Sequence, residues 1–462
     1  MPMMRKSLIE EFRNIVGRES ALCCREALRA YSYDSTTNWV HEPDLTLFPT
    51  GARQVSAIMK IANAERIPVT PRGGGTNGSG GSVPIRGGIV VCTTKMNRIL
   101  QIDKGYCSAT VEPGVVLCDL NSNLAREGFF FPPDPQSLRA ATIGGMIAEN
   151  AGGPACVKYG VTKQYILGLE VVLPTADIVY LGGRTLNAGA GYDLMHLVIG
   201  SEGTLGIVTK AELRLRPLPP FFKTVMAAYN DAAAAGETVF RVFANGIVPN
   251  KIEYMDNWII NRIEEMMPIG LPKDADAILL FQSDGGIEEA VEKEASKIVE
   301  IAIRHGAREA KAAKDQAEAD RYWAARAAGF AATFGKTKTV FAEDVTVPRP
   351  RIPDLIRKCK EISKKYNVEV VVLGHAGDGN FHPAVLTDIN NTEHYGRALR
   401  AVEEIIQSAV DLEGVISGEH GIGLEKQRFF DEVVDPVAVG MMKSIKRLFD
   451  PNDVMNPGKI WR

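Results

Sequence analysis

The sequence lacks the features that would place it in a membrane, outside the cell or on nucleic acid. None of its apolar runs approaches the ~20 residues that a membrane span requires, and its first residues carry charges where a signal peptide needs an apolar core. A net charge of -3 gives no attraction for nucleic acid or for an anionic membrane surface. We therefore expect a cytoplasmic protein, and peripheral association with the inner membrane through a partner is compatible with this.

Cysteine is scarce and wrongly spaced for holding a redox cluster. The seven cysteines include no Cys-x-x-Cys pair, which excludes a cysteine-only iron–sulfur cluster of ordinary spacing and fits a reducing compartment. Any iron–sulfur electron carrier must therefore belong to another chain.

Histidine is also scarce, yet two of the seven histidines lie in one stretch, Leu373-Gly-His-Ala-Gly-Asp-Gly-Asn-Phe-His-Pro383. Apolar runs on both sides predict a hairpin, with Asp378-Gly379 as its two-residue loop. That register sets His375 directly opposite His382, with Cβ atoms about 4.5–5.5 Å apart. Two imidazoles at this separation can share one divalent cation, which suits zinc, with iron or manganese as alternatives.

A further metal ligand has to come from another part of the chain. The stretch Ser417-Gly-Glu-His-Gly421 supplies Glu419 and, beside it, His420, between glycines that permit close approach. We predict that Glu419 completes the metal site with His375 and His382, and that His420 is the general base because imidazole titrates near neutral pH. The competing interpretation is a set of half-buried turn histidines, which accounts less well for the paired arrangement.

A glycine-rich stretch, Arg72-Gly-Gly-Gly-Thr-Asn-Gly-Ser-Gly-Gly81, is the second chemical signal. Its glycines expose backbone N–H groups, and such a nest binds phosphate oxygens. It lacks the Gly-Lys-Ser/Thr ending of a P-loop, and a strand rather than a helix follows it, unlike a Rossmann fingerprint. A flexible surface loop is the alternative on this evidence alone.

The chain is too long for one ordinary core, so we expect two domains. The sequence pattern changes near residues 217–220, from short apolar runs separated by glycine clusters to longer helical patterns. Earlier residues indicate a helix at 55–63 and short strands at 68–71 and 89–91. Later residues repeat a strand-then-helix order twice, 223–228 into 232–244 and 277–281 into 288–304, which predicts an antiparallel sheet backed by helices. A further helix is expected at 440–449.

Five motifs of the first half resemble, in order and spacing, the FAD-binding domain of the vanillyl-alcohol oxidase superfamily. They are Arg72-Gly-Gly-Gly-Thr76, Glu112-Pro-Gly114, Pro132-Pro-Asp-Pro135, Ala141-Thr-Ile-Gly-Gly145 with Asn150-Ala-Gly-Gly153, and Gly200-Ser-Glu-Gly-Thr-Leu-Gly206. The hairpin motif, Ser417-Gly-Glu-His-Gly-Ile-Gly423 and Asn456-Pro-Gly-Lys459 are similar to those of glycolate oxidase flavoprotein subunits and of D-lactate and D-2-hydroxyglutarate dehydrogenases. The resemblance covers nearly the whole chain.

The resemblance implies an α+β fold with a two-subdomain FAD-binding domain at 1–217 and an α+β substrate (cap) domain with an antiparallel sheet at 218–412. Residues 413–462 would carry the Gly-Glu-His-Gly motif back to the FAD domain. The implied FAD-binding residues are Arg72, Gly73, Gly74, Gly75, Thr76, Asn77, Gly78, Ser79, Pro133, Asp134, Thr142, Ile143, Gly144, Gly145, Asn150, Ala151, Gly152, Glu202 and Ile207. Some relatives attach flavin through a histidine in the glycine loop, and this loop has none, so FAD is expected to be non-covalent.

The same resemblance implies an FAD- and metal-dependent dehydrogenase of D-2-hydroxy acids that sends a hydride to flavin N5 and yields the 2-oxo acid. Arg326, in Trp323-Ala-Ala-Arg326, would bind the substrate carboxylate. Asn380 would either bind substrate or close the turn. Relatives that take 2-hydroxyglutarate tend to carry a lysine where this chain has Ala342, which favours D-lactate or glycolate.

Electrons would leave through an iron–sulfur subunit, an electron-transferring flavoprotein or a quinone, and a homodimer is compatible with the sequence. Two other functions stay open: a non-redox flavoenzyme resembling alkylglycerone-phosphate synthase, and a non-catalytic FAD-binding subunit. Bleaching of bound flavin by substrate separates these alternatives.

Overall fold

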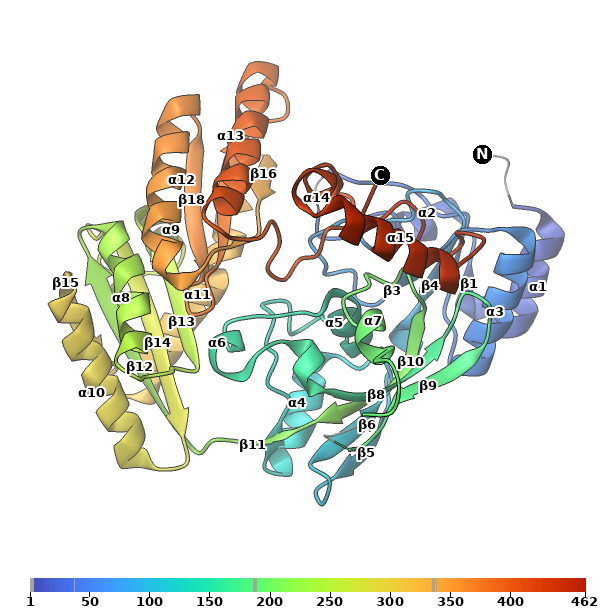
Figure 1. Ribbon diagram of the computed structural model, residues 1–462, viewed down its shortest axis with the longest axis horizontal. Coiled ribbons are helices and arrows are strands. Elements are labelled where there is room, and N and C mark those ends of the chain that lie inside the picture. The colour runs from blue at the N-terminus through green and yellow to red at the C-terminus, as the bar shows by residue number, and fades with distance from the viewer. Residues whose placement is uncertain (1–3, 37, 186–188, 335–336, 338) are drawn as a thin grey trace. The chain divides into compact units, whose positions relative to one another are not determined.

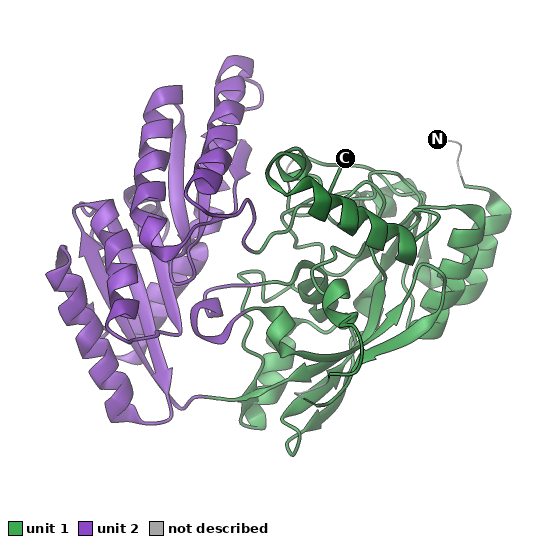
Figure 2. Cartoon of the chain, in the orientation of Figure 1, with its two compact units in different colours: residues 1–151, 161–218, 419–462 green, residues 152–160, 219–418 purple. Residues whose placement is uncertain are grey.

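The computed structural model describes residues 4–36, 38–185, 189–334, 337 and 339–462, and the chain divides into two compact units (Figures 1 and 2). Unit 1 comprises residues 1–151, 161–218 and 419–462, and unit 2 comprises residues 152–160 and 219–418. We expected domain boundaries after residues 217 and 412, and the two units meet after residues 218 and 418. The short stretch 152–160, expected in the first domain, is part of unit 2. Among the described helices, none is long and apolar enough to cross a membrane.

The first sheet of unit 1 is mixed and has the order β1-β2-β4-β3. Its strands are β1 (Ala21–Leu22), β2 (Leu45–Leu47), β3 (Val69–Arg72) and β4 (Ile89–Cys92). Because β2 and β3 both run parallel to β4, a crossover is needed, and α3 (Ala52–Glu65) supplies it. This helix buries Val55, Ile58, Met59 and Ala62 at helical spacing, in the same core as α1 (Lys6–Val16).

The second sheet of unit 1 is antiparallel and has the order β5-β6-β10-β8-β9. Its strands are β5 (Ile99–Asp103), β6 (Ser108–Val111), β8 (Ile166–Val172), β9 (Ile178–Gly182) and β10 (Ile207–Arg214). Further elements of the unit are α2 (Arg25–Leu28), α4 (Leu117–Arg126), β7 (Phe129–Phe130), α5 (Ile143–Glu149), α7 (Met195–Val198) and β11 (Arg216–Pro217). The C-terminal helices α14 (Gln427–Val433) and α15 (Pro436–Phe449) complete the unit.

Unit 2 is built on one antiparallel sheet, in the order β15-β12-β14-β13-β18-β19-β16, with β17 also paired to β19. The strands are β12 (Phe221–Tyr229), β13 (Lys251–Asp256), β14 (Ala277–Gly285), β15 (Ala307–Ala312), β16 (Thr339–Ala342), β17 (Val345–Thr346), β18 (Glu369–His375) and β19 (Asn380–Thr387). The helices are α6 (Cys156–Tyr159), α8 (Ala232–Ala244), α9 (Asn257–Met266), α10 (Glu288–Arg304), α11 (Gln316–Phe334), α12 (Ile352–Tyr366) and α13 (Thr392–Asp411).

Helices cover the sheet of unit 2 in two sets (Figure 1). Helices α10, α8, α12 and α13 pack against one another in that order and against the strands. Helices α9 and α11 share a core with alternate residues of the strands, such as Met226 and Ala228 on β12. The predicted antiparallel sheet backed by helices is confirmed, and the helices expected at 232–244 and 288–304 have those bounds.

The predicted hairpin is present, but its predicted register is wrong by two residues. His375 pairs with Asn380, and His382 pairs with Leu373, so the turn holds four residues, 376–379, instead of two. Residues of other segments form hydrogen bonds with the backbone of this turn. The Gly377 N–H donates to the Ile252 carbonyl, and the Gly379 carbonyl accepts from the Val347 N–H. Because the shift is an even number, His375 and His382 still share one face of the sheet.

Gly379 is expected to tolerate no side chain. Its φ is +83°, and an added Cβ would lie 2.1 Å from the Val347 carbonyl oxygen. Gly246 has a similar φ of +76° but open space around its Cβ position. We expect Gly379→Ala to lower the stability of the protein by about 1–3 kcal/mol more than Gly246→Ala, as measured by denaturant unfolding. Equal losses would show that the turn can move away from Val347.

Candidate functional site

Strands β18 and β19 bring the two hairpin histidines together in the interior of unit 2. The His375 and His382 rings are both buried, with centroids 5.2 Å apart in an edge-to-face arrangement. They are diagonal neighbours across the strand pair, which allows contact between large side chains. The juxtaposition that the sequence predicted is therefore present in a different register.

Glu253 on β13 orients the first of these histidines. His375 Nδ1 lies 2.8 and 3.0 Å from the two Glu253 carboxyl oxygens. Burial alone would raise the pKa of Glu253, but the charges of Arg326 and His375 hold that pKa below its usual value. Since an ionised carboxylate only accepts hydrogen bonds, the His375 proton must be on Nδ1. The lone pair of His375 is then on Nε2, which is the arrangement found in metal-binding histidines backed by a carboxylate.

Arg326, on α11, lies behind the same carboxylate. Its Nη2 is 2.6 Å from Glu253 Oε2, and both side chains are almost completely buried. Within the described chain, Nε and Nη1 of Arg326 have no hydrogen-bond partner. A buried guanidinium with unused donors is suited to an anionic ligand, because carboxylates accept two parallel N–H bonds from arginine. This fits the predicted binding of a substrate carboxylate.

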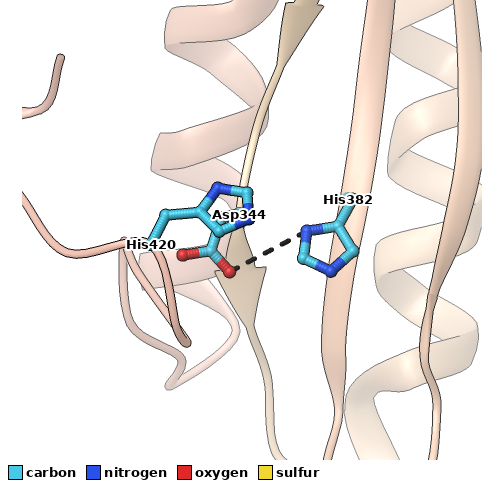
Figure 3. A group of neighbouring side chains, drawn as sticks. All are labelled: Asp344, His382 and His420. Atoms are coloured by element: carbon cyan, nitrogen blue, oxygen red, sulfur yellow. Dashed lines mark ion pairs between the residues drawn. The ribbon is translucent and has the colours of Figure 1, made fainter. Parts of the chain in front are cut away.

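Asp344, between β16 and β17, organises the other side of the hairpin. Its Oδ1 accepts from Asn380 Nδ2 at 2.7 Å and lies 3.9 Å from His382 Nδ1 (Figure 3). Its Oδ2 accepts from the Ser417 hydroxyl at 2.6 Å and from the Gly418 N–H at 2.9 Å. The Asn380 amide, predicted either to bind substrate or to close the turn, is thus bonded to Asp344 and is buried.

The predicted ligand Glu419 and base His420 follow directly after Gly418, the last residue of unit 2. Successive Cα atoms are about 3.8 Å apart, so the anchoring of Gly418 by Asp344 restricts where Glu419 can lie. His420, also labelled in Figure 3, belongs to unit 1, where its Nδ1 is 3.2 Å from the Cβ position of Gly78. The candidate base therefore lies against the glycine-rich loop.

Close backbone packing explains the glycines of the cofactor motifs in unit 1. An added Cβ on Gly74 would lie 2.3 Å from the Ala140 carbonyl oxygen, and one on Gly144 would lie 2.7 Å from Pro113 Cβ. One on Gly73 would lie 2.2 Å from Thr142 Oγ1, and Thr142 also caps α5. Three segments far apart in the sequence therefore meet closely at glycines that leave no room for a Cβ. Such a cradle fits a long, flat, phosphate-bearing cofactor.

The other predicted cofactor residues lie on the segments around this cradle. Arg72 is buried and donates to the Tyr33 carbonyl, so its guanidinium supports the loop from within. Gly152 alone among the predicted set is counted in unit 2. The remaining members are Gly75, Thr76, Asn77 and Ser79 in the glycine loop, Pro133 and Asp134 after β7, Ile143, Gly145, Asn150 and Ala151 in or after α5, Glu202, and Ile207 at the start of β10.

Two carboxyl groups that meet at Gly421 set the electrostatics of this region. Oε2 of Glu149 and Oε1 of Glu202 lie 2.6 and 3.0 Å from the Cβ position of Gly421. Burial and the charge of Glu202 raise the pKa of Glu149 well above its usual value, which favours the neutral acid. Burial also raises the pKa of Glu202, although the N–H groups of Ile422 and Gly423 donate to it. Nearby, burial lowers the pKa of Lys459 to about 8.

Sequence reasoning missed Glu253, Asp344 and Glu149. The position of Glu253 between Ile252 and Tyr254, in the middle of β13, is an available signal, since a buried charge needs a partner. We found no comparable local signal for Asp344, whose partners come from β19 and from residues 417–418.

Comparison with known proteins is consistent with this geometry. Residues 218–460 match the family described as FAD linked oxidases, C-terminal domain, and residues 43–182 match the FAD binding domain family. The chain belongs to the FAD-linked oxidases. It is an FAD-linked oxidoreductase with a fold of the vanillyl-alcohol oxidase type.

Relatives of this FAD-linked oxidase match over nearly their full lengths. It is 39% identical to glycolate oxidase subunit GlcD of Bacillus subtilis, over 99% of this chain and 97% of the relative. It is 34% identical to a D-lactate dehydrogenase of Anaerostipes hadrus, over 98% and 97%. Among solved structures, p-cresol methylhydroxylase with substrate bound superposes with a TM-score of 0.81 at 21% identity, over 98% of this chain and 96% of that one.

Replacing Glu253 tests whether His375 is a metal ligand. Glu253→Gln removes the ionised acceptor of His375 Nδ1, and loss of such a supporting carboxylate typically costs about 10- to 100-fold in metal affinity. Chelator competition with purified protein measures the affinity, and circular dichroism checks that the variant is folded. The control is Glu237→Gln, at a more exposed acidic position on α8. Unchanged affinity in Glu253→Gln would contradict a metal role for His375.

Proposed function

We propose that the protein oxidises a D-2-hydroxy acid, D-lactate or glycolate, to the 2-oxo acid by means of non-covalent FAD and one divalent metal ion. The buried chain Arg326–Glu253–His375, with His382 beside it, is the observation that supports this most strongly. It combines donors for a carboxylate with histidine nitrogens for a cation. The names of the relatives, glycolate oxidase subunit and D-lactate dehydrogenase, support the same substrate class.

The predicted metal ligands and Arg326 would bind the two ends of such a substrate. His375, His382 and Glu419 would hold the metal ion, for which zinc is our first choice by its donor set of two nitrogens and one oxygen. Nε and Nη1 of Arg326 would pair with the substrate carboxylate. The glycine loop, the α5 region and Glu202 would hold FAD in unit 1. Bound metal would acidify the substrate hydroxyl, and bound FAD would accept the hydride.

His420 would take the hydroxyl proton. It adjoins the proposed ligand Glu419 in sequence and lies against Gly78 of the cofactor loop. Neutral imidazole is a suitable base near pH 7. Asn380 and Asp344 would act as positioning residues, since the amide of Asn380 is bonded to Asp344 and Asp344 anchors residues 417–418.

The residue at position 342 favours a small acid in this proposal. Ala342, at the end of β16, offers no charge for a second carboxylate. Electrons would pass to an iron–sulfur subunit, an electron-transferring flavoprotein or a quinone. The word subunit in the names of the GlcD relatives supports a protein acceptor.

Anaerobic mixing with substrate tests the function directly. We expect D-lactate or glycolate to bleach the flavin absorbance of the holoenzyme, and expect chelator treatment to abolish bleaching. D-2-hydroxyglutarate should bleach more slowly, because Ala342 cannot pair with its distal carboxylate. Faster bleaching by the diacid would overturn the choice of substrate. No bleaching by any 2-hydroxy acid would overturn the dehydrogenase and favour a non-redox or non-catalytic role.

Two histidine variants should separate metal binding from proton transfer. His382→Asn should lose bound metal, because a ligand is removed, whereas His420→Asn should keep metal and lose substrate-dependent bleaching. General-base removal typically costs about 10²–10⁴-fold in rate. Metal analysis and stopped-flow absorbance measure the two properties. Loss of metal from His420→Asn would assign that residue to the metal site instead.

A further inference from the structure

Helix α15 of unit 1 (Figure 1) exposes an apolar face that the proposed reaction does not use. Val437, Met441 and Leu448 expose 71%, 63% and 79% of their surface. At 100° per residue these three positions fall within one narrow stripe. The opposite side of the helix carries the buried residues Val439 and Lys446. Large apolar side chains grouped on an exposed face mark interaction sites more often than scattered ones do.

The buried side of α15 is bonded to segments next to predicted cofactor residues, Glu202 among them. Lys446 Nζ donates to the Thr204 carbonyl at 3.0 Å and to the Met455 carbonyl at 2.7 Å. Asn456, next to Met455, donates from Nδ2 to the carbonyls of Gly81 and Glu202. A helix with its side chains is about 10–12 Å across. A protein docked on the outer face of α15 would therefore be separated from the 200–206 segment by roughly one helix.

The charge of α15 restricts the nature of such a partner. The helix contains Lys443, Lys446 and Arg447 and no acidic residue. Lys446 is buried and the half-buried Lys443 donates to the Arg462 carbonyl, whereas Arg447 is exposed beside the apolar stripe. A partner that fits this surface has an apolar patch with aspartate or glutamate along one rim, since complementary charge steers and orients docking.

We propose that the outer face of α15 docks the protein that accepts electrons from the flavin. The two electrons that substrate oxidation leaves on the flavin would pass to the partner, one at a time to iron–sulfur clusters or both to a flavin, and the flavin proton would pass to water. This inference rests on the proposed dehydrogenase function. Proximity to the cofactor segments favours an electron acceptor over a second copy of this chain, and the chain's slightly negative net charge disfavours an anionic membrane.

Steady-state kinetics of the holoenzyme with two kinds of acceptor tests the proposal. A small dye reports oxidation of substrate alone. A purified electron-transferring flavoprotein and a purified iron–sulfur subunit, both encoded by the same genome, report transfer to protein. We expect Met441→Glu and Leu448→Glu to raise the KM for the active protein acceptor by about tenfold or more, as loss of a central interface contact does, with dye reduction unchanged. Leu100→Glu, at an exposed leucine on β5, should change neither.

Charge reversal tests the acidic rim of the partner. Arg447→Glu should raise the KM for the protein acceptor, and the difference from wild type should shrink as salt is added, because exposed charges are screened. Unchanged acceptor KM in all three α15 variants would overturn the proposal, as would normal dye turnover with no transfer to either protein.

Other occupants of the same face would be recognised by different measurements. A wild-type dimer that the leucine or methionine variant dissociates, seen by sedimentation, would assign α15 to self-association and overturn the proposal. Binding of the wild-type protein to phosphatidylcholine–phosphatidylglycerol vesicles, abolished in these variants, would assign α15 to a membrane surface and also overturn the proposal. Failure of dye reduction with every 2-hydroxy acid would instead overturn the dehydrogenase function itself.

Discussion

The interior of unit 2 depends on one buried carboxylate, that of Glu253. It is the partner of His375 on one side and of Arg326 on the other. Removing a charge from water is costly, and an opposite charge at hydrogen-bond distance offsets that cost. Glu253 thereby fixes the tautomer of His375 and keeps the Arg326 guanidinium in the interior. The ion pair with this carboxylate accounts for the burial of Arg326, and the hydrogen bond from Nδ1 accounts for the orientation of His375.

Two other carboxylates, those of Asp344 and Glu202, bind the two ends of the segment that carries the proposed base. In unit 2, Asp344 accepts hydrogen bonds from Ser417 and Gly418. In unit 1, Glu202 accepts from the N–H groups of Ile422 and Gly423. His420 lies between these two anchored ends of one short stretch. Backbone N–H groups bonded to a carboxylate make strong, charge-assisted contacts, so each end of this stretch is anchored within its own unit.

The spacing of apolar residues predicted the helices, which depend on residues close together in the sequence. The helices at 232–244 and 288–304 follow from apolar spacing and have the expected bounds. The register of the hairpin did not follow from its own sequence, because Gly377 and Gly379 bond to Ile252 and Val347 of other segments. Glu253 is 122 residues from His375, and no short-range rule pairs residues so distant. The cofactor motifs were recognisable because their glycines are required by backbone contacts that leave no room for a side chain.

The unused donors of Arg326 affect the stability of unit 2. A buried guanidinium satisfied by only one carboxylate leaves part of its desolvation cost uncompensated. A bound anion that fills Nε and Nη1 removes that penalty, so the interior of unit 2 is more stable with such a ligand than without it. A monocarboxylate brings one negative charge to this arginine, which is the charge that the unsatisfied donors of the site require.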